Sequence, residues 1–146
     1  MDNKTVNNRY AAVLILRVLL GLIFLMQGFG KVFNFGIENM YNSFFAQYES
    51  TFLPKWLIWF TAYYTSFIEL ICGLLLTLGI FKQISLYFLG SVLIIISFGH
   101  GLLEPVWVLQ HLFFRGAMLI SLLFLPNTWD KYSLDNLFFH HNYKGK

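Results

Sequence analysis

Charged residues are scarce in this sequence. Asp, Glu, Lys and Arg make up 12% of its 146 residues, and only seven residues are acidic. Soluble globular proteins carry about 25% charged residues, so the composition indicates a protein surrounded by lipid. The formal net charge of +3 is small and is not gathered into a basic patch of the kind that binds nucleic acid.

Cysteine is nearly absent as well. The single cysteine, Cys72, cannot form a disulfide within the chain, which excludes a two-cysteine thiol relay. The first apolar run is longer than the core of a signal peptide and has no small-residue cleavage site before its end. We therefore expect that run to be retained as a helix.

Long apolar runs account for most of the chain. Four of them reach the length of about 20 residues that a membrane-spanning helix needs. They cover about residues 10–33, 56–80, 84–103 and 106–125. We expect one membrane domain over residues 1–146, with an all-α fold: an integral membrane four-helix up-down bundle.

The segment between the first two runs, residues 39–52, is rich in aromatic residues at helical spacing. Polar residues occupy its other faces. The pattern predicts a short amphipathic helix in the outer membrane interface. The alternative is an aromatic-rich loop packed on the bundle.

Basic residues flank the runs unevenly. Those predicted on one side are Lys4, Arg9, Lys82, Lys131, Lys144 and Lys146, against Lys55 and Lys31 on the other. Basic residues concentrate on the cytoplasmic side of membrane proteins. This asymmetry predicts that both termini are cytoplasmic.

A few ionisable residues interrupt the apolar runs or lie at their edges. They are Arg17, Lys31, Glu69, His100, Glu104, His111 and Arg115. A charge inside the hydrocarbon core costs roughly 2.5–3.5 kcal/mol by insertion scales. We expect these groups to be paired, hydrated or used for function.

Helical spacing places several of these groups on the same faces as small residues. The first run carries Arg17, Gly21, Phe24, Gly28 and Lys31 on one face, and the second carries Ala62, Ser66, Glu69, Gly73 and Thr77. A rise of about 1.5 Å per residue puts Glu69 roughly 20 Å below the outer edge, between the depths of two arginines. We infer a polar cavity that opens outward and is floored by Glu69 and an arginine.

Three groups of these residues together resemble the DoxX family of small four-helix membrane proteins. The groups are Arg17-x3-Gly21-x6-Gly28-x-Gly30-Lys31, Glu69-x3-Gly73-x5-Gly79 and Gly99-His100-Gly101. The resemblance covers about residues 10–125. It implies a bacterial inner-membrane protein tied to redox metabolism, in a group that includes the large subunit of an archaeal thiosulfate:quinone oxidoreductase.

The ionisable residues allow structural and chemical interpretations. Glu69 either forms an ion pair with Arg17 or Arg115, or is a carboxyl that transfers protons. Arg115 either pairs with Glu69, or binds an anion or polarises a quinone carbonyl. His111 can exchange protons near neutral pH. We take Glu69, His111 and Arg115 as the candidate catalytic residues.

Lys31, His100 and Arg17 are the candidate substrate-binding residues. Each also has a structural interpretation: Lys31 as an interfacial anchor, Arg17 as a side chain that reaches the cytoplasmic surface, and His100 as a hydrogen-bonded interface residue. Haem ligation by His100 and His111 is disfavoured, because one such pair in a small bundle is weak evidence. Axial ligands must also face each other.

Two function classes follow from these residues. The first is a subunit of a membrane redox system that interacts with a quinone or another small molecule. Such an oxidoreductase subunit needs a partner, another membrane or periplasmic protein, to deliver electrons. The second is a non-catalytic scaffold or accessory subunit of a larger membrane complex, in which the buried charges dock helices against one another.

Overall fold

The computed structural model describes residues 3–103 and 110–139, and every regular element in these ranges is helical. The long helices are α1 (Asn3–Phe29), α3 (Lys55–Leu78) and α4 (Lys82–Leu103), and α5 (Gln110–Phe124) is shorter. Short helical turns lie between α1 and α3. The expectation of an all-α fold is confirmed.

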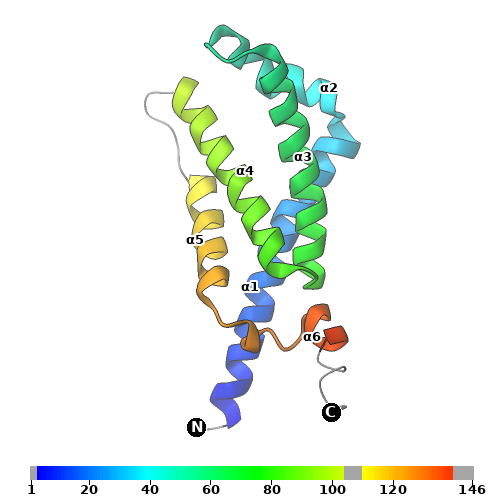
Figure 1. Ribbon diagram of the computed structural model, residues 1–146, viewed down its shortest axis with the longest axis vertical. Helices are drawn as coiled ribbons and strands as arrows, with labels where there is room; N and C mark the ends of the chain where they lie inside the picture. Colours follow the sequence, from blue (N-terminus) through cyan, green and yellow to red (C-terminus); the bar gives the residue numbers. More distant parts are fainter. Residues whose placement is uncertain (1–2, 104–109, 140–146) are drawn as a thin grey trace.

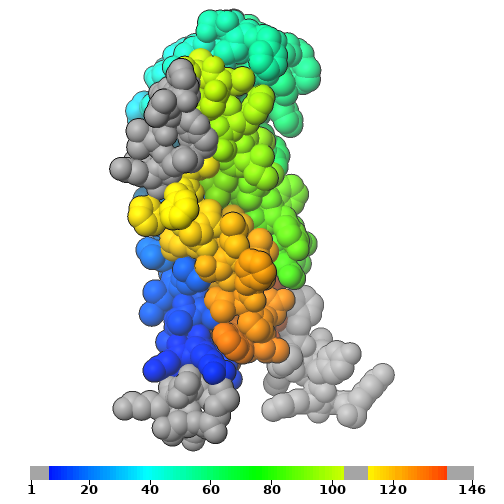
Figure 2. Space-filling view, turned by 90° about the vertical axis from the view of Figure 1, so that its left-hand side faces the viewer, coloured from blue at the N-terminus to red at the C-terminus, as the bar shows by residue number. Residues whose placement is uncertain are grey.

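The helices run alternately up and down the long axis of the molecule (Figure 1). Helix α1 packs against α3 and α5, and α4 packs against the same two helices. Figure 2 shows α5, in yellow to orange, lying between α1 and α4. The start of α1 and the short helix α6 (Leu134–Phe139) lie at the same end, called here the lower end.

Three of the helical segments are long and apolar enough to cross a membrane: residues Asn7–Phe35, Lys55–Leu78 and Lys82–Leu103. These match three of the four predicted spans. The fourth, predicted over residues 106–125, is described only from residue 110, and its apolar part, Leu112–Phe124, is shorter. Residues 106–109 lie outside the described ranges.

Helix boundaries follow local chemistry. Helix α1 begins at Asn3, well before the predicted start at residue 10. Its first turns are polar, so they lack the apolar pattern from which the span was predicted. Gly79 ends α3 in the left-handed conformation, with φ 73°, and its N–H donates to the carbonyl groups of Leu75 and Leu76. This arrangement is a common C-terminal cap of helices.

Glycines bring α1 and α3 unusually close together. A Cβ atom on Gly21 would collide with Thr77, one on Gly73 with Leu25, and one on Gly28 with the backbone of Leu70. The residue numbers of these contacts increase along α1 while they decrease along α3, as expected for antiparallel helices. The small-residue stripes predicted to face the interior do so here.

Leucine-rich packing fills the lower half of the interior. The fully buried members of this core include Leu20, Phe24, Leu76, Leu86 and Leu89. Many large apolar side chains point outward instead, among them Ile15, Met26, Ile94, Phe113 and Phe124. Exposed apolar surface on this scale is typical of a protein that contacts lipid.

The segment predicted as one interfacial helix is helical but broken. It consists of α2 (Ile37–Met40), the π-helical turn η2 (Tyr41–Phe45) and the 3-10 turn η3 (Ala46–Ser50). Exposed Phe44 and Phe52 extend from it. The segment is thus helical over residues 37–50, with a change of winding at Tyr41 and another at Ala46, and its place in a membrane interface stays a prediction.

Tyr41 anchors this segment to α3. Its ring stacks on Trp59 with centroids 3.7 Å apart, and its hydroxyl donates to Glu49 Oε1 at 2.6 Å. Lys55 Nζ lies 3.1 Å from the same carboxylate. Burial, together with the Glu49 carboxylate, raises the pKa of Tyr41 to about 12. The hydrogen bond from Tyr41 and then that from Lys55 lower the pKa of Glu49.

We expect Gly28→Ala to destabilise the protein and Gly30→Ala to leave its stability nearly unchanged. The added methyl group at residue 28 meets the backbone of Leu70, whereas at residue 30 nothing lies within 4 Å of the new atom. Forced overpacking of this kind costs about 1–3 kcal/mol. Thermal unfolding of both variants in the same detergent measures the difference, and equal unfolding midpoints would contradict the close crossing.

Candidate functional site

Glu69 is the carboxylate at the centre of the candidate site. It lies in α3, one residue before the position where Gly28 of α1 contacts the helix backbone, and it is completely buried. Its Oε2 atom lies 2.6 Å from Lys31 Nζ. The structure therefore pairs Glu69 with a lysine, and not with either of the arginines considered from the sequence.

Lys31 lies at the point where the winding of α1 changes. The α-helix ends at Phe29 and continues as a π-helical turn, η1 (Gly30–Phe35). A π-helical turn rotates side chains away from the directions that α-helical spacing predicts, and such turns are frequent at functional sites. The Lys31 side chain retains 16% exposure, so the pair lies at the edge of the buried interior.

Arg115 approaches the same region from α5. Its Nη1 donates to Gln27 Oε1 at 2.6 Å, and its guanidinium carbon lies 5.9 Å from the centroid of the Phe24 ring. Arg115 is close enough to Glu69 to interact with its charge. The sequence reasoning missed Gln27, although it lies next to Gly28 on the helix that carries Lys31.

The cluster has more cations than anions, with Lys31 and Arg115 against one carboxylate. Glu69 Oε1 is buried and has no hydrogen-bond partner among the described residues. A buried carboxylate oxygen without a partner is costly, and such groups are often found where a ligand or water binds. The cluster can offer N–H donors to a ligand oxygen and a carboxyl group that exchanges a proton.

Arg17 does not belong to this cluster. It contacts the last turn of α3, where its Nη1 donates to the carbonyl oxygens of Leu76 and Thr77 at 2.9 and 2.7 Å. Leu76 lies two helical turns, or about 10 Å, from Glu69 along α3. Arg17 therefore lies apart from the other substrate-binding candidate near Glu69, Lys31.

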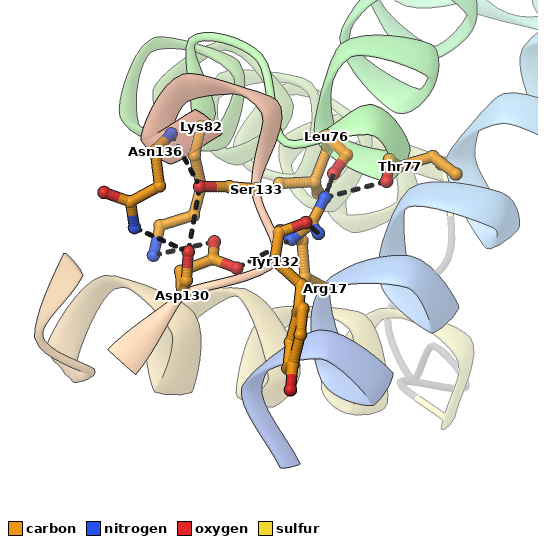
Figure 3. A network of polar contacts seen from close by, with 8 residues as sticks. All are labelled: Arg17, Leu76, Thr77, Lys82, Asp130, Tyr132, Ser133 and Asn136. Carbon is orange, nitrogen blue, oxygen red and sulfur yellow. Dashed lines mark hydrogen bonds and ion pairs between the residues drawn. The ribbon is translucent and has the colours of Figure 1, made fainter. Parts of the chain in front are cut away.

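Arg17 instead holds the segment that follows α5. Its Nε donates to Asp130 Oδ1 at 3.1 Å, and its Nη2 donates to the carbonyl oxygen of Tyr132 at 3.2 Å (Figure 3). Lys82 Nζ lies 3.4 Å from Asp130 Oδ2. We call Arg17, Asp130 and Lys82 the lower charge network. The guanidinium is buried with its donors in use, so it need not reach the surface.

The remaining candidates are placed apart or only partly described. His100 lies in the last turn of α4 and is exposed. His111 belongs to α5, one turn before Arg115, but its side chain lies outside the described part of the structure. Glu104 also lies outside it. Cys72 is buried in the apolar core, as a small core residue would be.

The fold and this site define a small helical protein with apolar, membrane-capable helices and charged groups buried between them. The family model DoxX matches residues 12–102, and the chain belongs to the DoxX family. No curated protein and no solved structure matches the chain. The matched region includes Lys31 and Glu69, whereas Arg115 and Asp130 lie beyond it.

We expect Lys31→Met to destabilise the protein strongly, because it leaves Glu69 buried without its cation. Removing one partner of a buried ion pair costs about 3–5 kcal/mol. The double variant Lys31→Met with Glu69→Met should recover much of this loss, because it removes both charges. Chemical unfolding in mild detergent measures all three proteins.

Lys55→Met provides the matched control, since Lys55 also pairs with a glutamate but is 67% exposed. Exposed pairs contribute little to stability. A Lys31→Met variant as stable as Lys55→Met would show that Lys31 and Glu69 do not form a buried pair.

Proposed function

We propose that this protein spans the bacterial inner membrane as a four-helix bundle. The apolar outer faces of the helices support this placement, and α5 completes the bundle between α1 and α4. Both termini face the cytoplasm in this proposal. Arg9, Lys82 and Lys131 lie at the lower end, in keeping with the bias of basic residues toward the cytoplasm.

Within the membrane, the protein serves as a subunit of a redox system and binds a quinone or another small oxidised molecule. The observation that carries this proposal is the buried Glu69, with one oxygen paired to Lys31 and the other without a partner. A carboxyl group that moves protons needs this kind of sheltered position close to cations that adjust its proton affinity.

The residues have distinct roles in this proposal. Lys31 and Arg115 donate hydrogen bonds to the carbonyl oxygens of the quinone, and Gln27 holds Arg115 in place. Glu69 passes a proton to a reduced oxygen. His111, one turn before Arg115 in α5, is the proposed second proton carrier. Reduction of a quinone to a quinol takes up two electrons and two protons.

Electrons come from another membrane or periplasmic subunit in this proposal. The lone Cys72 cannot cycle between a dithiol and an internal disulfide. The protein thus supplies the binding site and the protons, and the partner supplies the electrons. In this proposal the protein is therefore one subunit of an oxidoreductase.

A scaffold role is the alternative, and the lower charge network favours it. Arg17 joins α1 to the end of α3 and to the segment after α5. Contacts of this kind are expected of a charged side chain with a purely structural role. If Lys31 and Glu69 act in the same way, the protein holds a larger complex together without binding a small molecule.

Substitution of the two central charges separates the alternatives. We expect both Glu69→Gln and Arg115→Gln to insert and fold. Arg115→Gln should weaken quinone binding by about tenfold or more, since hydrogen bonds to charged groups contribute about 1.5–3 kcal/mol. Glu69→Gln should lose turnover, because an amide cannot pass the proton. Binding of a water-soluble quinone to the purified protein measures the first effect, and quinone-dependent turnover in membranes measures the second.

Exposed Glu38→Gln is the matched control for Glu69→Gln, and Arg9→Gln is the control for Arg115→Gln. Both controls should bind and turn over like the unaltered protein. Unchanged binding and turnover in both central variants, with partner proteins still co-purifying, would refute the redox site and favour the scaffold.

A further inference from the structure

A pocket of about 320 Å³ lies at the lower end, beside the turn from α3 into α4. Its size is at the small end of the range for ligand sites, about 300–1,000 Å³. Lys82 and Ile84 of α4 line it on one side, and Asp130 and Asp135 line it from the segment after α5. It is distinct from the candidate site at Glu69, which lies ten residues before Gly79 in α3.

Two buried charged atoms of the pocket lining have no hydrogen-bond partner among the described residues. They are Lys82 Nζ and Asp130 Oδ2, which lie 3.4 Å apart. The Lys82 side chain is 8% exposed and that of Asp130 is 3% exposed. Figure 3 shows the two groups side by side below Ser133. The pocket wall therefore holds a cation that can still donate and a carboxylate that can still accept.

The α4 side of the pocket favours an anion. The helix begins at Lys82, and its first three residues line the pocket together with the preceding Phe81. The first N–H groups of a helix have no partner within the helix and attract anions, phosphates above all. At this end of α4, the backbone N–H of Ser85 donates a hydrogen bond to the carbonyl oxygen of Phe81. Lys82 adds a full positive charge to this end.

The opposite side of the pocket favours a cation. Asp135 lines it and is half-buried, and its backbone N–H donates to the carbonyl oxygen of Gly79 at 3.1 Å. This bond fixes the residue against the end of α3. The carboxylate is outside the lower charge network, so it can pair with a ligand. The pocket thus offers positive charge at one side and negative charge at the other.

The rim of the pocket is apolar. Phe81 and Ile84 both line it and are each 54% exposed. They continue the apolar outer surface of α4 toward the lower end. A polar pocket with an apolar rim, at the end of a membrane-capable helix, suits the polar head of a lipid whose acyl chains lie along the helix.

We propose that this pocket binds the phosphoethanolamine head group of a membrane lipid, with the phosphate at Lys82 and the start of α4 and the ammonium at Asp135. This inference rests on the membrane placement proposed above but not on any chemistry at Glu69. The zwitterionic head matches the two charged sides of the pocket. A phosphoglycerol head would leave Asp135 without a cation.

The test uses the full chain with equal amounts of dioleoyl phosphatidylethanolamine and dioleoyl phosphatidylglycerol, followed by native mass spectrometry. We expect the protein to retain the ethanolamine lipid about tenfold more than the glycerol lipid, the effect of one charge-assisted hydrogen bond. Asp135→Asn should bring the ratio close to one. Glu38→Gln, an exposed acid at the other end, should leave the ratio unchanged.

Lys82→Gln should reduce retention of both lipids. If the loss of Lys82 unfolds the lower end, the result for Asp135→Asn still decides the test. Soluble glycerophosphoethanolamine at the same concentration should not displace the lipid, because it lacks acyl chains to pack on Phe81 and Ile84. Equal retention of the two lipids, a ratio that survives in Asp135→Asn, or displacement by the soluble compound would overturn the proposal. A chain that fails to enter lipid nanodiscs contradicts the membrane placement instead.

Discussion

The close approach of α1 to α3 is the constraint on which the rest of the structure depends. Gly21 and Gly28 on one helix and Gly73 on the other allow backbone contact along most of the crossing. Where helices cannot gain stability by leaving water, such packing is a main source of association. It also buries Glu69 and sets the depth at which Lys31 and the end of α3 meet their partners.

Helix α3 contributes to charged contacts at two levels of the molecule. At the lower end, Arg17 uses its donors on carbonyl groups and on Asp130, which joins α1, α3 and the segment after α5 into one unit. At the upper level, Glu69 has a cation on one oxygen and no hydrogen-bond partner on the other among the described residues. Each level thus keeps a buried carboxylate oxygen without a hydrogen-bond partner among the described residues, Asp130 Oδ2 below and Glu69 Oε1 above.

Much of the fold could be predicted from the sequence, because apolar length and helical spacing report directly on spans and on inward faces. Glu69 and the glycines were placed correctly for that reason. The partners of the charges were harder to predict. Helical spacing placed Lys31 on the inward face, but it did not indicate which of the inward cations pairs with Glu69. Asp130 lies 113 residues from Arg17 in the sequence, in a segment without apolar periodicity, so helical spacing could not relate the two.

The contact between Lys31 and Glu69 can be measured directly by zero-length coupling with a membrane-permeant carbodiimide. The reagent activates the buried carboxyl group, and an amine within contact distance then forms an amide with loss of one water molecule. With Nζ and Oε2 at 2.6 Å, peptide mapping should find Lys31 joined to Glu69. A carbodiimide adduct on Glu69 without coupling, or coupling of Glu69 to another lysine, would contradict the account.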